Sequence, residues 1–122
     1  MQRRHFLRLV RQALDDLPSP YRDWLDNVTV VVERRPRASH RRRAGLSVGD
    51  TLFGLYEGVP LTDRTSAYGL VQPDMIFIFQ EPLERSFPDD AALVEEVRRT
   101  VLHELAHHFG ITDEELERLG LD

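Results

Sequence analysis

The chain has 122 residues, a formal net charge of −5 and no cysteine. This length suits one hydrophobic core, so we expect a single domain over residues 1–122. Without cysteine, a disulfide scaffold and every cysteine-ligated metal site are excluded, and a metal ion has to be held by His, Asp or Glu.

The N-terminus carries an arginine pair, Arg3-Arg4, that resembles the core of a twin-arginine export signal. Such a signal continues into an uninterrupted apolar stretch, and here Arg11, Asp15 and Asp16 interrupt it. No segment approaches the roughly 18 apolar residues of a membrane span. We therefore expect a cytoplasmic protein that does not bind a membrane.

Hydrophobic spacing predicts a first helix over residues 6–17, which Pro18 and Pro20 end. Residues 21–25 fit one further helical turn, in which we expect Trp24 to be a core residue.

Three segments have the pattern of strands. Residues 28–33 are mostly β-branched, and residues 51–57 form a second candidate. Residues 75–80 are short and almost continuously apolar, which favours a central place in the sheet. Together with the helices, these segments predict an α+β fold in which a small sheet of three to five strands packs against helices.

The basic residues are all arginine and are concentrated near the N-terminus. Residues 1–43 hold 11 arginines and 5 acidic residues, whereas residues 44–122 hold 5 arginines and 16 acidic residues. The run Arg34–Arg43 has almost no apolar side chains, so we expect a solvated loop there. Contact with nucleic-acid phosphates is the alternative for this run. Because no recognition motif accompanies it and the rest of the chain is acidic, nucleic acid is not the partner we expect.

A long helix is predicted over about residues 91–109, with Asp89 or Asp90 as its cap. Gly110 is a natural terminator, and residues 112–115 have the spacing of a capping box for a short last helix. The buried stripe of the long helix has helical spacing and consists of Leu93, Val94, Val97, Val101, Leu102 and Leu105.

This helix carries the sequence His103-Glu104-Leu105-Ala106-His107. Residues four apart lie on the same helical face, so the two imidazoles can converge on one metal ion. Glu104 lies one position round the helix and can reach a water beside the metal, as a general base does. Zinc, the ion that these ligand types favour, lowers the pKa of such a water to about 7.

A catalytic zinc site uses three protein ligands, so a third is needed. Gly110 can end the helix sharply and turn the chain back, which lets Asp113 present its carboxylate to the ion. Asp113 could instead be a first-turn acid favoured by the helix dipole, with Thr112 as the cap. In that case His108, or one of Glu114 and Glu117, is the alternative ligand, although we expect His108 to face a neighbouring loop.

The pattern His103-Glu104-x-x-His107-x-x-Gly110-x-x-Asp113 resembles the long zinc motif of the metzincin clan, in the variant with aspartate as third ligand. With the segments 54–58 and 60–62, the chain is similar over about residues 20–120 to a family of small bacterial zincin-like metallopeptidases. Metzincins also carry a methionine-containing turn after the motif, whereas this chain has only Met1 and Met75.

The resemblance implies a minimal zincin-like domain with a mixed sheet and with the zinc motif on the long C-terminal helix. It implies His103, His107 and Asp113 as Zn²⁺ ligands and Glu104 as the general base of a metallopeptidase. It also implies that a peptide or protein substrate binds along a sheet edge, for which residues 52–57 are the candidate.

Two questions stay open at the level of sequence. The alternative to a peptidase is a zinc-stabilised binding or regulatory module with little or no turnover. Tyr56 and Tyr68 could each supply a hydroxyl to an oxyanion, although packing is the role that we expect for both.

Overall fold

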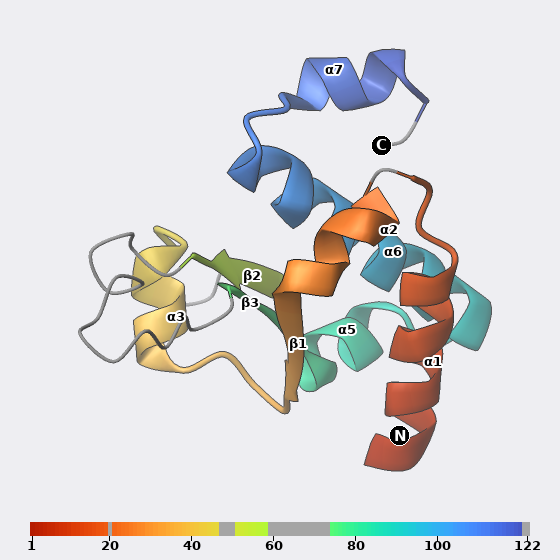
Figure 1. Ribbon diagram of the computed structural model, residues 1–122. Coiled ribbons are helices and arrows are strands. Elements are labelled where there is room, and N and C mark those ends of the chain that lie inside the picture. Colours follow the sequence, from red (N-terminus) through yellow and green to blue (C-terminus); the bar gives the residue numbers. More distant parts are fainter. Residues whose placement is uncertain (20, 47–50, 59–73, 121–122) are drawn as a thin grey trace, which may run out of the picture.

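The computed structural model describes residues 1–19, 21–46, 51–58 and 74–120, and within them a three-stranded sheet lies between two layers of helices (Figure 1). The strands are β1 (Val28–Glu33), β2 (Gly54–Glu57) and β3 (Asp74–Phe79), in the spatial order β1-β3-β2. β1 and β3 are parallel, and β2 is antiparallel to β3. The fold is therefore α+β with a small mixed sheet, and β3 has the central position that its apolar sequence predicts.

The central strand β3 supplies both faces of the sheet because successive side chains of a strand alternate. Ile76 and Ile78 are fully buried on one face, and Phe77 and Phe79 are buried on the other. The first pair belongs to the main core and the second to a smaller core with Leu55.

The main core is covered by α1 (Arg3–Asp15), α5 (Gln80–Ser86) and α6 (Asp90–His108). α2 (Tyr21–Trp24) and the 3₁₀ turn η1 (Leu25–Asn27) lead into β1. The expected stripe of α6 is buried, as predicted: Leu93, Val94, Val97, Val101, Leu102 and Leu105. Trp24 is only partly buried and packs against the margin of this core.

Capping residues define both ends of α6. The side chain of Asp89 accepts a hydrogen bond from the N–H of Ala92 at 3.0 Å, so Asp89 rather than Asp90 is the cap of α6. Gly110 follows α6 with a φ of +80°, a conformation that glycine adopts without strain, and α7 (Asp113–Arg118) begins after Thr112. No helix in the described part of the chain is long and apolar enough to cross a membrane.

The arginine run contains a helix, α3 (Ala38–Arg43), and the expectation of a loop over Arg34–Arg43 is wrong at that point. The helix is anchored by one buried side chain instead of an apolar stripe, and this is why its sequence lacks a helical signal. His40 is 4% exposed, and its ring centroid lies 4.6 Å from that of Phe77 and 5.1 Å from that of Phe79.

Ion pairs also hold this segment. Arg34 and Arg35 both pair with Glu81, at 3.1 and 2.6 Å. Two further pairs join an arginine of the run to an acid on a strand: Arg37 to Glu33 and Arg43 to Glu57.

A close approach joins β2 to α6. A Cβ atom placed on Gly54 would lie 2.6 Å from Cγ2 of Thr100 and 3.0 Å from the carbonyl oxygen of Phe77. Only a residue without a side chain allows the strand to lie this close to the helix.

We expect Gly54→Ala to destabilise the protein by about 1–3 kcal/mol, because overpacking forces the strand or the helix to move. Thr100→Ala should restore part of that loss in the double variant, since it removes one of the two clashing atoms. Chemical denaturation of the wild type, both single variants and the double variant measures this coupling. A Gly54→Ala protein as stable as the wild type would contradict the close approach.

His40 makes α3 sensitive to acid. Burial lowers the pKa of the His40 imidazole below its ordinary value of 6.5, with further lowering by the charges of Arg37 and Arg43 and an opposing effect of Glu33. The neutral ring also accepts a hydrogen bond at Nδ1 from the N–H of Arg37, at 3.0 Å, which the protonated ring cannot do.

Because the folded-state pKa is the lower one, the unfolded chain binds more protons, and stability falls as the pH decreases below 6.5 toward the folded-state pKa. We expect His40→Leu to remove this part of the pH dependence of stability. Denaturation of both proteins at several pH values between about 5 and 8 measures the difference. Parallel stability curves for the two proteins would rule out a neutral, buried His40.

Candidate metal centre

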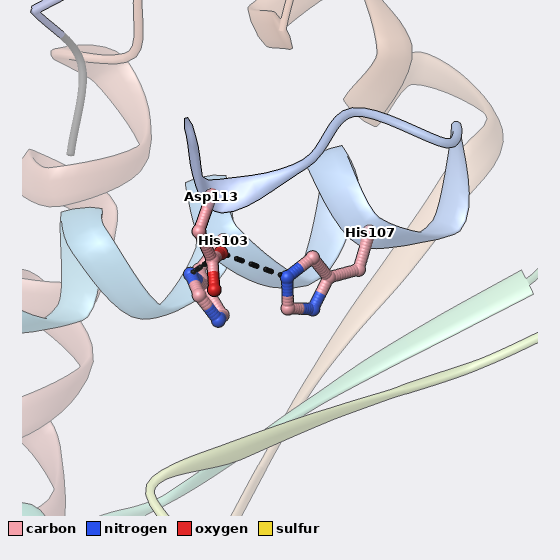
Figure 2. Close-up of side chains that lie close together, drawn as sticks. All are labelled: His103, His107 and Asp113. Atoms are coloured by element: carbon pink, nitrogen blue, oxygen red, sulfur yellow. Dashed lines mark hydrogen bonds and ion pairs between the residues drawn. The ribbon is translucent and has the colours of Figure 1, made fainter. Parts of the chain in front are cut away.

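Two imidazoles of α6 project from the same face of its last turns (Figure 2). The ring centroids of His103 and His107 are 4.1 Å apart, and the rings meet edge to face. Both side chains are about half exposed, at 47% and 46%. The four-residue spacing in the sequence produces this arrangement because α6 is continuous through both positions.

A sharp reversal after α6 brings Asp113 back to the two histidines. The N–H of Ile111 donates to the carbonyl of Ala106 at 2.7 Å, which closes the helix end around Gly110. Thr112 then caps α7, and its Oγ1 accepts from the N–H of Glu115 at 3.2 Å. Asp113, the first residue of α7, thereby faces α6 across the turn.

The Asp113 carboxylate lies between the two rings (Figure 2). Its Oδ1 is 3.3 Å from Nδ1 of His103 and 2.9 Å from Nε2 of His107. One donor atom from each of the three residues lies within 4.8 Å of the other two. Ligands bound tetrahedrally at 2.0–2.2 Å are about 3.4 Å apart, a separation within that bound, so these three residues could hold a metal ion.

The alternative third ligands lie elsewhere. Glu114 and Glu117 are not part of this group of converging side chains. His108 was expected to face a neighbouring loop; in the structure its ring stacks on Tyr56 of β2 with centroids 4.0 Å apart.

Glu104 faces the sheet instead of the group of donors. Its Oε1 accepts a hydrogen bond from the N–H of Tyr56 on β2, at 3.0 Å. Burial raises the pKa of the Glu104 carboxyl above its ordinary value, against the lowering effects of this hydrogen bond and of the charges on His103 and His107. A partly desolvated carboxylate with one oxygen held in place is suited to accept a proton at Oε2.

A second polar cluster supports this contact, and the sequence reasoning missed one of its members. The hydroxyl of Tyr56 donates to Oδ2 of Asp74 at 2.6 Å, and Nε2 of His108 lies 3.5 Å from the same oxygen. The cluster ties β2 to the first residue of β3 and to the end of α6. Asp74 directly precedes the apolar strand residues, and this position was the available signal.

The cluster also indicates what the Tyr56 hydroxyl does. In this structure the Tyr56 hydroxyl donates a hydrogen bond to Asp74 and so connects two strands of the sheet, which is a structural role. Tyr68 lies outside the described residues.

The comparisons with known proteins agree with this picture. The family model for zincin-like metallopeptidases matches residues 25–121, so the chain belongs to that family. A conserved hypothetical protein from Thermus thermophilus has a similar fold, with a TM-score of 0.56 at 23% sequence identity over 99% of this chain and 100% of that one. No curated protein matches.

We expect Thr112→Ala to weaken zinc binding, because the Thr112 cap sets where α7 begins and hence where Asp113 points. The substitution should also cost about 1 kcal/mol of stability without zinc. Asp89→Ala is the matched control, since it removes the cap at the opposite end of α6 at a similar cost. Competition with a zinc chelator measures the two affinities, and equal affinities in both variants would contradict the role given to the cap.

Proposed function

We propose that this protein is a zinc-dependent metallopeptidase in which His103, His107 and Asp113 hold the ion and Glu104 is the general base. The observation that carries the proposal is the convergence of two imidazoles and one carboxylate beside a separate, partly buried glutamate. Membership of the zincin-like family supports it, because that family is described as metallopeptidase-like.

The donor set is appropriate for zinc. Two histidines and one aspartate leave a position open for water or substrate, as catalytic zinc sites do. When bound there, zinc would supply Lewis acidity that activates a water and polarises a carbonyl. The three side chains are exposed, so both the ion and a substrate can reach them.

Glu104 is positioned to transfer a proton from the attacking water to the leaving amine. Its Oε1 is held by the N–H of Tyr56, so Oε2 stays available to take a proton from an attacking water. The same atom can then pass that proton to the leaving amine.

Strand β2 is the surface along which an extended peptide would bind. It lies at the end of the strand order β1-β3-β2 within the described residues. Pairing of a peptide with such an edge uses main-chain hydrogen bonds and thus depends little on sequence. The residues 52–57 expected for this role include the whole of β2.

We do not propose nucleic acid as the partner. Within the described residues, Arg34, Arg35, Arg37 and Arg43 each pair with a carboxylate. Arginines neutralised in this way have less charge to offer to phosphates.

The test is cleavage of a diverse peptide library by zinc-loaded wild type and zinc-loaded Glu104→Gln. We expect Glu104→Gln to bind zinc as the wild type does and to lose at least about 100-fold in rate, the usual contribution of a general base. Glu114→Gln, which changes an exposed acid of α7, is the matched control and should cleave normally.

Equal cleavage by the wild type and Glu104→Gln would contradict the peptidase assignment. Zinc binding without any cleavage would favour the alternative, a zinc-stabilised module with a binding role. That module would lose stability on chelation, because metal affinity adds to the free energy of folding.

A further inference from the structure

A cavity of about 400 Å³ opens beside the proposed catalytic residues. His103 and Glu104 form one end of it, and Glu96 and Arg99 line its wall on the preceding turns of α6. Glu96, Arg99 and His103 lie on one face of the helix because they are separated by three, four and seven residues, and Glu104 lies one position round from His103. The cavity therefore runs along α6 toward its N-terminus.

The remaining walls are mostly apolar and come from three other places. Phe53 and Gly54 line the cavity from the start of β2, and Leu116 lines it from α7. Leu102 of α6 also contributes. The close contact between Gly54 and Thr100 bounds the cavity on the sheet side.

The charges that line the cavity are not balanced. Arg99 is engaged by Glu95, with its Nε 3.6 Å from Oε1 of that residue. Glu95 also pairs with Arg98, at 2.6 Å. Glu96 makes no hydrogen bond or ion pair with any residue that the structure describes, although its side chain is partly buried.

An unpaired acid in a partly desolvated position is stabilised by a cation from outside. Burial raises the pKa of the Glu96 carboxyl, and the charge on Arg99 opposes this effect without cancelling it. An apolar side chain in the cavity would desolvate Glu96 further, and an acidic one would be repelled by it. A basic side chain would satisfy it.

We propose that this cavity binds an arginine or lysine side chain of the peptide substrate, next to the bond that is cleaved. The aliphatic stem would lie against Phe53, Leu102 and Leu116, and the charged head would pair with Glu96. Glu96 precedes His103 by seven residues, which is about 10 Å along the helix axis. Only a long side chain spans that separation, so arginine should be preferred over lysine.

This inference rests on the proposed function and deepens it by naming the substrate class. It assigns Glu96 as a residue that determines specificity, distinct from the residues that carry out the chemistry.

The experiment uses blocked peptides that share one sequence and differ at one position beside the cleaved bond, as arginine, lysine, leucine or glutamate. We expect the zinc-loaded wild type to cleave the arginine peptide with a kcat/KM at least about tenfold above that of the leucine peptide, and the glutamate peptide most slowly. Glu96→Gln should lose this preference through KM, with the KM of the arginine peptide rising toward that of the leucine peptide. Glu117→Gln removes the same charge from an exposed position outside the cavity and should keep the preference.

Binding of the same peptides to zinc-loaded Glu104→Gln, measured by calorimetry, separates this inference from the proposed function. Tighter binding of the arginine peptide, without cleavage by the wild type, would overturn the peptidase assignment and support the cavity's role. Cleavage that favours leucine or glutamate, or a basic preference that persists in Glu96→Gln, would overturn this inference alone. Equal binding of all four peptides would overturn it as well.

Discussion

Strand β2 and helix α6 meet at a distance that only glycine permits, and the position of the candidate site follows from that contact. Gly54 leaves room for Thr100, so the strand can lie directly against the helix. Two residues further along, the N–H of Tyr56 reaches the Glu104 carboxylate. A strand displaced outward by one methyl group would lengthen that hydrogen bond and release Glu104. The backbone of an edge strand thus orients a side chain that the helix alone leaves free to rotate.

Helical spacing places the buried apolar residues of α6 on one face and the candidate site residues on the neighbouring faces. Leu93, Val97, Val101 and Leu105 recur at intervals of four residues and are buried against the core. The residues that line the cavity and the metal centre occupy the neighbouring faces. Because both sets belong to one rigid element, burial of the apolar stripe fixes the direction of the imidazoles. The stability of the core and the geometry of the site therefore depend on the same helix.

Local spacing in the sequence was enough to predict the parts of the site that lie on one continuous segment. The histidine pair, the turn at Gly110 and the return of Asp113 all lie within eleven residues, and the structure brings those side chains together. Their capacity to bind a metal stays a prediction. The strands and the buried stripe of α6 were likewise predictable, because their apolar periodicity is strong.

The features that were missed depend on contacts between distant segments. Helix α3 is held by His40 against phenylalanines of β3, and no pattern within residues 38–43 shows that. Helix α5 was not expected: it follows β3 without a loop and begins at Gln80, which the predicted strand 75–80 included, and Pro82 lies in its first turn, where proline is tolerated. The contact between Tyr56 and Asp74 joins residues 18 apart in the chain. In each case the sequence contains the side chains but not the fact that they meet.

Two neighbouring acids on α6 differ in their partners. Glu95 has arginines three and four residues ahead of it, and it pairs with both. Glu96 has Arg99 and Thr100 at the same offsets, and Arg99 is already engaged by Glu95. Within the described residues, Arg34, Arg37 and Arg43 of the arginine run pair with other acids instead of with Glu96. Within the described residues, Glu96 has no hydrogen bond or ion pair, and it lies at the wall of a cavity beside the candidate catalytic centre. A charge on the substrate explains this position better than solubility does, because an exposed acid would serve solubility without the cost of partial burial.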